Sequence, residues 1–176
     1  MNWTKLLKME IDSTYRTTER LLDRVKDESL EWKPASGSNW MTMGQLIQHL
    51  TNACGWGCRG FVTGEWGLPE GKTWADLTPE ESLPPAENLP ASPSVAEARR
   101  LLEEDRMLAL AMVNRAGEER LALEGAATPW APAVRRVLGL QLLRMVQHLD
   151  RHKSQLFYYL KLEGEPVETK DLWDGP

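Results

Sequence analysis

Apolar residues recur at three- and four-residue steps over four long segments of the chain, with charged residues between them. This spacing predicts four amphipathic helices, because residues three and four apart share one face of a helix. The expected helices span residues 3–25, 42–63, 92–116 and 133–161, with Ser94 and Leu138 as alternative starts of the last two. No stretch alternates with period two over β-branched residues, so we expect an all-α fold.

Capping residues mark the ends of these segments. Thr42 and Gln45 form a capping box at the start of the second helix, and Ser94 with Glu97 can form another at the third. Gly117 and Gly164 are typical stops for the third and fourth helices. Glycines inside the second helix are costly there, so we expect a close helix or ligand approach to require them.

The second and third helices are joined by a proline-rich segment, residues 64–91, that shows no helical or strand period. A connection of this length is unusual between antiparallel neighbours, which need only a short turn. We therefore expect these two helices to run in the same direction within a four-helix bundle. The bundle forms one domain over residues 1–176, with an irregular tail at residues 165–176.

Composition narrows the classes of function. The chain has 176 residues, a net charge of −5 and a pI of about 5.3, without a dense cluster of Lys or Arg. This charge argues against nucleic acid as the main partner. No apolar run is long enough to span a membrane, and charges interrupt the N-terminus, so we expect neither a membrane contact nor a signal peptide and place the protein in the cytoplasm.

Two histidines, His148 and His152, lie four residues apart in the fourth helix, which stacks their imidazoles on one face. The remaining histidine, His49, lies in the second helix beside apolar residues. If the two helices pack together, three imidazoles converge and leave open positions on a divalent metal, as in catalytic sites. The alternative is a pair of polar residues on a half-exposed helix face.

The order of these features resembles the DinB/YfiT-like metalloenzyme family. The resemblance rests on Leu30-Glu31-Trp32-Lys33-Pro34, on Met43-Gly44-Gln45-Leu46-Ile47-Gln48-His49-Leu50, and on the pattern His-x-x-x-His-x-x-Gln-Leu from His148, followed by Tyr-Leu-Lys-Leu-Glu-Gly. It covers residues 6–164, and its specificity lies in the ordered combination. Lys153 and Ser154 stand where family members often have Arg-Gly.

The resemblance implies an up-down-down-up bundle and a divalent metal, zinc or nickel, on His49, His148 and His152. Several family members are thiol-dependent transferases or isomerases that use bacillithiol or mycothiol, and a homodimer is plausible by the same resemblance. We therefore expect a small-molecule transferase or hydrolase. The alternative is a non-enzymatic binding or stress-response module with a structural or absent metal.

Further polar residues are candidates for the same site. Asp105 interrupts the apolar stripe of the third helix and is a candidate ligand, hydrogen-bond acceptor for an imidazole, or general base, with a surface ion pair to Arg99 or Arg106 as the alternative. Gln155 and Tyr15 are pocket candidates whose alternatives are a hydrogen bond within the bundle and a core position. We expect the capping box to occupy Gln45.

Cysteines and tryptophans near the end of the second helix have two interpretations each. Cys54 and Cys58 are four residues apart and form either a thiolate zinc site with His49 or, as we prefer, two buried apolar residues. Trp56 and Trp66 either wall a ligand pocket or belong to an aromatic core.

Overall fold

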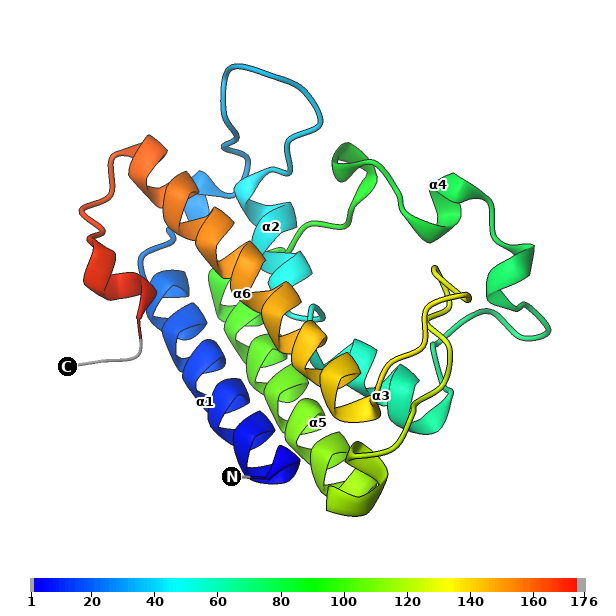
Figure 1. Cartoon of the computed structure of the whole chain (residues 1–176). Helices are drawn as coiled ribbons and strands as arrows, with labels where there is room; N and C mark the ends of the chain where they lie inside the picture. The colour runs from blue at the N-terminus through cyan, green and yellow to red at the C-terminus, as the bar shows by residue number, and fades with distance from the viewer. Residues whose placement is uncertain (1, 174–176) are drawn as a thin grey trace.

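The computed structural model describes residues 2–173, and the regular structure of this part of the chain is helical (Figure 1). The α-helices are α1 (Trp3–Leu22), α2 (Met43–Leu50), α3 (Gly55–Thr63), α4 (Pro79–Ser82), α5 (Val95–Leu121) and α6 (Leu138–Glu163). The 3-10 turns are η1 (Asp27–Ser29), η2 (Trp74–Asp76), η3 (Ala86–Asn88) and η4 (Thr169–Leu172). The expected all-α class is confirmed, since two isolated bridges are the only β pairing among residues 2–173.

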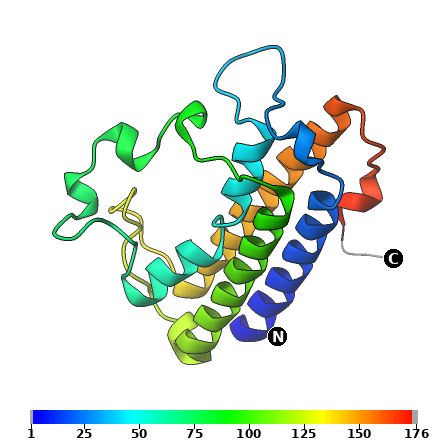
Figure 2. The same cartoon turned by 180° about the vertical axis from the view of Figure 1, so that it is seen from behind.

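Three long helices, α1, α5 and α6, lie side by side, and α2 and α3 together take a fourth position beside them (Figures 1 and 2). The helix α1 packs against α5 and α6, and α3 packs against the same two helices. In Figure 1 the chain ascends along α1 and α6 and descends along α2, α3 and α5. None of the described helices has the length and apolarity needed to cross a membrane.

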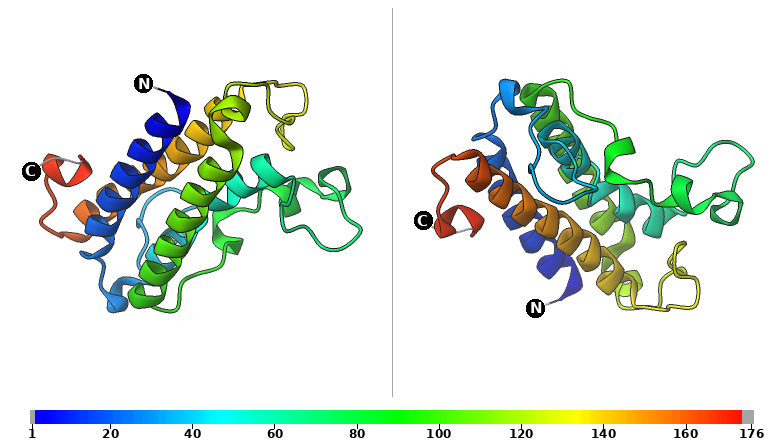
Figure 3. Two further views of the ribbon diagram at one scale, coloured as in Figure 1. Left: turned by 90° about the horizontal axis from the view of Figure 1, so that it is seen from below. Right: turned by 90° about the horizontal axis from the view of Figure 1, so that it is seen from above.

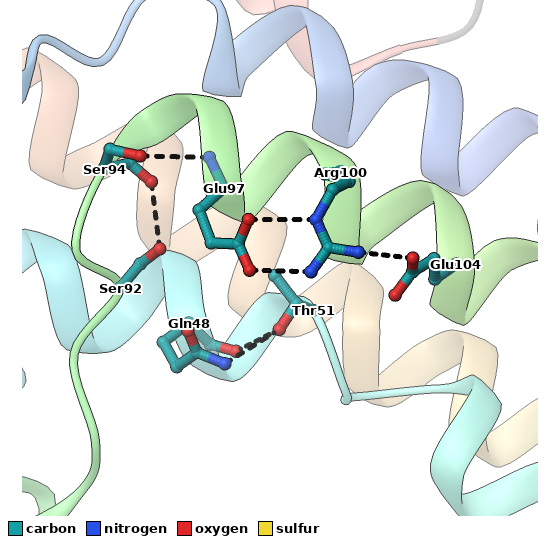
Figure 4. A network of polar contacts seen from close by, with 7 residues as sticks. All are labelled: Gln48, Thr51, Ser92, Ser94, Glu97, Arg100 and Glu104. Carbon is teal, nitrogen blue, oxygen red and sulfur yellow. Dashed lines mark hydrogen bonds and ion pairs between the residues drawn. The ribbon is translucent and has the colours of Figure 1, made fainter.

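Residues that the sequence predicts as helix caps lie at helix ends in the structure. The Thr42 hydroxyl accepts from the Gln45 N–H, and the Gln45 side chain accepts from the Thr42 N–H, which completes the capping box of α2. Of the two possible starts for α5, the structure uses Ser94, whose hydroxyl accepts from the Glu97 N–H (Figure 4). The expected capping box stays incomplete there, because the Glu97 carboxylate accepts from Arg100 instead. Gly164 ends α6 with a positive φ of 95°, the left-handed conformation that glycine adopts without strain.

Two helix ends differ from the expected ones. The helix α1 ends at Leu22, not at Val25, because the last turn tightens into bonds from the N–H of Arg24 and Val25 to carbonyls three residues earlier. Gly117 leaves the helical conformation (φ 68°, ψ 166°), but α5 resumes for one more turn to Leu121. That extra turn has a role, because the Glu118 carboxylate accepts from the first N–H groups of α1.

The expected second helix is wrong as a single element, since it breaks between α2 and α3. The cause is a buried carboxylate from α5. Asp105, 5% exposed, accepts hydrogen bonds from the N–H groups of Cys54 (3.3 Å), Gly55 (2.9 Å) and Trp56 (3.0 Å). These are the orphan donors of a helix N-terminus, so the carboxylate caps α3 and fixes where it begins. The hydroxyl of Tyr15 donates to the same carboxylate at 2.6 Å.

Glycine permits this close approach. A Cβ on Gly55 would lie 2.3 Å from the Asp105 carbonyl oxygen, so a larger residue would push α3 away from α5. A Cβ on Gly57 would meet the Met145 side chain of α6 at 2.4 Å. The glycines of this region therefore serve a close helix approach, as their cost in a helix suggests.

The long connection and the tail are tied to the bundle by buried polar side chains. The Gln45 amide donates to the carbonyls of Glu87 and Leu89 at 3.1 and 2.8 Å, which holds the end of the connection on α2. Lys153, 5% exposed, donates to the Leu172 carbonyl at 2.8 Å and so binds η4. Elsewhere the connection leaves the bundle, and both it and the loop before α6 extend on the side away from the C-terminus (Figure 3).

We expect Asp105→Ala to lower the free energy of unfolding by about 3 kcal/mol or more, because the buried donors at the start of α3 and the Tyr15 hydroxyl lose their acceptor. Urea unfolding followed by circular dichroism measures the change. Glu104→Ala is the control, since Glu104 is the preceding residue, is exposed and pairs with Arg100 on the surface. Equal losses in the two variants would contradict the capping role.

Candidate metal centre

The structure brings all three histidines of the chain together from α2 and α6. His148 and His152 lie one turn apart on α6, and their Nε2 atoms are 3.1 Å apart. The ring of His49 lies with its centroid 4.3 Å from that of His152 and 5.2 Å from that of His148. One nitrogen from each ring lies within 4.8 Å of the other two.

Packing of α2 against α6 produces this convergence. Ile47 and Leu50 are fully buried on α2, and Leu149 is fully buried on α6, so the imidazoles stand at the edge of an apolar contact. All three rings are themselves only half-buried. They are therefore partly desolvated while one side of the cluster stays open to solvent.

Burial and mutual proximity keep these imidazoles neutral. Burial, followed by the charges of His152 and His148, lowers the pKa of His49 to about 4. Burial is also the main cause that lowers the pKa of His148 and of His152, and the nearby charge of Arg151 adds to both effects. Each ring therefore carries a free lone pair at neutral pH, which is the form that binds metals.

A backbone carbonyl fixes the ring of His148. Its Nδ1 lies 2.9 Å from the carbonyl oxygen of Ala53, in the break between α2 and α3. A carbonyl only accepts, so Nδ1 carries the proton and Nε2 keeps its lone pair for the cluster. This anchor has no signal in the sequence, since any residue supplies a carbonyl.

The Gln155 side chain contacts the other histidine of the pair. Its Oε1 lies 3.0 Å from Nδ1 of His152. Gln155 thus makes a hydrogen bond within the bundle, as the alternative interpretation has it, and through this bond it holds a ring of the cluster. Its place in a ligand pocket stays a prediction. Acceptors on the outer nitrogen of metal-binding histidines are the usual way in which proteins orient such rings.

The donor set fits a divalent transition metal. Two imidazole nitrogens that bind one zinc ion at tetrahedral angles lie about 3.3 Å apart, close to the 3.1 Å between Nε2 of His148 and Nε2 of His152. Neutral imidazole suits zinc and nickel, among others. The residues of this cluster therefore fit the ion that the sequence implies.

Asp105 faces the core, as expected, but its hydrogen bonds go to α3 and Tyr15, and it is outside the histidine cluster. Burial raises the pKa of its carboxyl, and the hydrogen bonds from Tyr15 and the α3 amides oppose that rise. The alternative of a surface ion pair is wrong, since Arg99 and Arg106 pair with other carboxylates. A role of Asp105 as a general base stays a prediction.

Tyr15 is 2% exposed, so its body belongs to the core. It also borders a groove of about 390 Å³ between α1 and α5, and a second groove of about 310 Å³ lies between α1 and α6. The histidines line neither groove. In the first groove Arg106 is already paired with Asp12. The two grooves along α1 and the histidine cluster therefore lie at different places on the protein.

Cys54 and Cys58 are free and fully buried, with their sulfurs 4.0 Å apart. Neither belongs to the histidine cluster. The hydrogen bond with Cys58, followed by burial, raises the pKa of the Cys54 thiol well above its ordinary value, so it stays protonated. This agrees with two buried apolar residues and not with a thiolate zinc site.

Trp56 and Trp66 belong to an aromatic cluster in which each ring meets its neighbours edge to face. Its other members are Phe61, Trp74 and Trp130, and neighbouring centroids lie 5.1 to 6.5 Å apart. The cluster joins α3 to the long connection and to the loop before α6. Phe61 is buried, but the four tryptophans are half-buried or, in the case of Trp130, 45% exposed, so the cluster packs at the surface of the bundle. Its role as the wall of a ligand pocket stays a prediction.

Comparisons with known proteins agree with this fold. The model of the DinB superfamily matches residues 10–156. A DinB-like protein from Bacillus cereus ATCC 10987, with a crystal structure at 2.01 Å resolution, superposes with a TM-score of 0.55. The match has 19% sequence identity and covers 88% of this chain and 89% of that one, which shows a shared fold. No curated protein matches the chain.

We expect the metal-free protein to lose stability as the pH falls from about 6.5 toward about 4. The pKa of each histidine is lower in the folded state, so the unfolded chain binds more protons in this window and acid favours unfolding. Urea unfolding at a series of pH values, with a chelator present, measures the slope. A His49→Asn variant should show a shallower slope, and an unchanged slope would contradict the assignment.

Proposed function

The chain belongs to the DinB superfamily, and we propose that it is a metal-dependent enzyme in which His49, His148 and His152 hold one divalent ion, zinc or nickel. The observation that supports this most directly is the cluster itself, with three neutral imidazoles from two helices within 4.8 Å of one another. Three protein ligands leave coordination positions for a small molecule, which is typical of catalytic sites.

An ion held in this way lowers the pKa of a bound water or thiol to near neutrality. The side chains contribute the rest. Ala53 and Gln155 hold two of the rings by their outer nitrogens. Arg151 is exposed, and its charge acts on both His148 and His152. The positive charge of Arg151 near the cluster would favour an anionic group there, such as a thiolate or the carboxylate of a substrate.

We propose a transferase that acts on a small electrophilic molecule, with a low-molecular-weight thiol of the bacillithiol or mycothiol type as co-substrate. Hydrolysis of a small molecule is the other reaction that the same donor set supports. The proposal includes a cytoplasmic location, which rests on the composition, and a homodimer, which rests on the family resemblance.

The alternative is a binding or stress-response module in which the ion is structural or absent. One observation favours it: the grooves of about 390 and 310 Å³ along α1 do not border the histidines. In the proposed enzyme, the substrate would bind on the open side of the histidine cluster. Metal content and thiol binding separate the two functions.

We expect protein purified without an affinity tag to hold about one divalent ion per chain, and we expect His148→Ala to lose it, because two imidazoles bind transition metals far more weakly than three. Elemental analysis by mass spectrometry measures the content. Gln147→Ala is the matched control, since it is the neighbouring exposed residue of α6. A wild-type protein that folds without metal, and does not take up zinc or nickel, would refute the proposed enzyme.

We expect bacillithiol or mycothiol to raise the melting temperature of the metal-loaded protein, since a ligand at 100 times its Kd adds about 2.7 kcal/mol to the folded state. The thiol should have no effect on the His148→Ala variant. Differential scanning fluorimetry measures both. A metal-loaded protein that responds to neither thiol would argue against the transferase and leave the hydrolase.

A further inference from the structure

Tyr159 lies one turn beyond Gln155 on α6 and is 2% exposed. Its hydroxyl donates to the carbonyl oxygen of Met41 at 3.0 Å, and the Gln155 amide nitrogen lies 3.3 Å from the same hydroxyl. The rings of Trp32 and Trp40 meet the Tyr159 ring edge to face, with centroids 5.4 and 6.2 Å away. The segment that precedes α2 thus holds this side chain in place.

The direction of each hydrogen bond in this network follows from the Met41 carbonyl. The Met41 carbonyl can only accept, so the proton of the Tyr159 hydroxyl points toward it. The Tyr159 oxygen must then accept from Gln155, which places the amide NH₂ on this side of Gln155. The Gln155 carbonyl oxygen is left facing His152, so Nδ1 of His152 is the donor.

These hydrogen bonds determine which tautomer His152 adopts. With the proton on Nδ1, Nε2 keeps its lone pair and lies 3.1 Å from Nε2 of His148, which also carries no proton. In the metal-free protein the hydrogen bonds of Tyr159 and Gln155 must therefore outweigh a competing Nε2–H···Nε2 bond between the two rings. If the Gln155 amide turned over, its NH₂ would face Nδ1 and favour the tautomer with a proton on Nε2. That proton would occupy the position at which a metal binds, so the ring could serve as a ligand only after it changed tautomer.

We infer that Tyr159 is a positioning residue for His152 and acts through Gln155. The Tyr159 hydroxyl orients the amide, and the amide selects the tautomer that exposes Nε2. The importance of that tautomer for metal binding rests on the proposed function, but the tautomer itself is a property of the metal-free protein. The two can therefore be tested apart.

The first measurement is the tautomer of each histidine in the metal-free protein, by long-range ¹H–¹⁵N NMR correlation at about pH 8, where the imidazoles are neutral. The wild type should show His152 with its proton on Nδ1. Tyr159→Phe should give a mixture of both tautomers at His152 and leave His148 unchanged, since His148 is held by Ala53. Tyr158→Phe, which removes a hydroxyl from an adjacent side chain that is 62% exposed, should match the wild type.

The second measurement is zinc affinity by competition with a chromogenic chelator. Tyr159→Phe should weaken binding about 10- to 100-fold, the range found when outer hydrogen-bond partners of metal ligands are removed. In the Gln155→Glu background the same exchange should have no effect on tautomer or affinity. An ionised carboxylate can only accept from Nδ1, so it needs no hydroxyl to orient it.

A single Nδ1-protonated tautomer at His152 in Tyr159→Phe, with wild-type zinc affinity, would overturn the inference. Equal losses of affinity with Gln155 and with Gln155→Glu would also overturn it, because they would indicate a general structural role for Tyr159. A change at His148 as large as that at His152 would have the same meaning. If the wild type binds no metal, the proposed function fails, while the tautomers still decide the role of Tyr159.

Discussion

A single buried carboxylate determines where α3 begins and how the chain passes from α2 to α3. Asp105 on α5 accepts from the first N–H groups of α3, and so stops the preceding helix and starts the next one in a new direction. The carbonyl of Ala53, released from helical bonding by this break, is the one that holds His148. The residue therefore acts on the histidine cluster at a distance, through the path of the backbone, and not as one of its members.

The two histidines of α6 are held by different kinds of partner. His148 depends on a backbone carbonyl, which cannot change its hydrogen-bonding role. His152 depends on the Gln155 amide, which can present either its accepting oxygen or its donating NH₂ to the ring. A further group is therefore needed to orient this amide. The break after α2 supplies the carbonyl that holds His148, whereas α6 itself supplies Gln155 and Tyr159. Met41, just before α2, holds the Tyr159 hydroxyl in turn, so both helices that carry the histidines contribute to the support of the cluster.

Local signals in the sequence predict much of this fold. The capping box at Thr42, the cap at Ser94 and the stop at Gly164 all act as expected, because each depends only on residues within one helical turn. The convergence of the histidines is also predictable, since it follows from the spacing of two residues and the apolar surroundings of the third. The resemblance to the DinB/YfiT-like family supports both the predicted fold and the predicted convergence of the histidines.

The remaining features depend on partners far apart in the chain. The break in the second helix comes from Asp105, about 50 residues downstream, and nothing between Thr51 and Cys54 announces it. The apolar stripe of α5 predicts that Asp105 faces the core. It does not predict whether the carboxylate accepts a hydrogen bond from an imidazole or from the N-terminus of a helix. The partner of Gln155 has the same ambiguity, because several donors and acceptors lie one turn away on α6.

His49 and His148 are about 100 residues apart in a chain whose two cysteines are both free. An ion that binds both would close a covalent-like loop of that length and restrict the unfolded chain much as a disulfide does. For a loop of about 100 residues the chain-entropy model assigns such a cross-link about 4 to 5 kcal/mol. Under reducing conditions, in which disulfides do not persist, a metal would thus give this bundle a reversible cross-link that a chelator can remove.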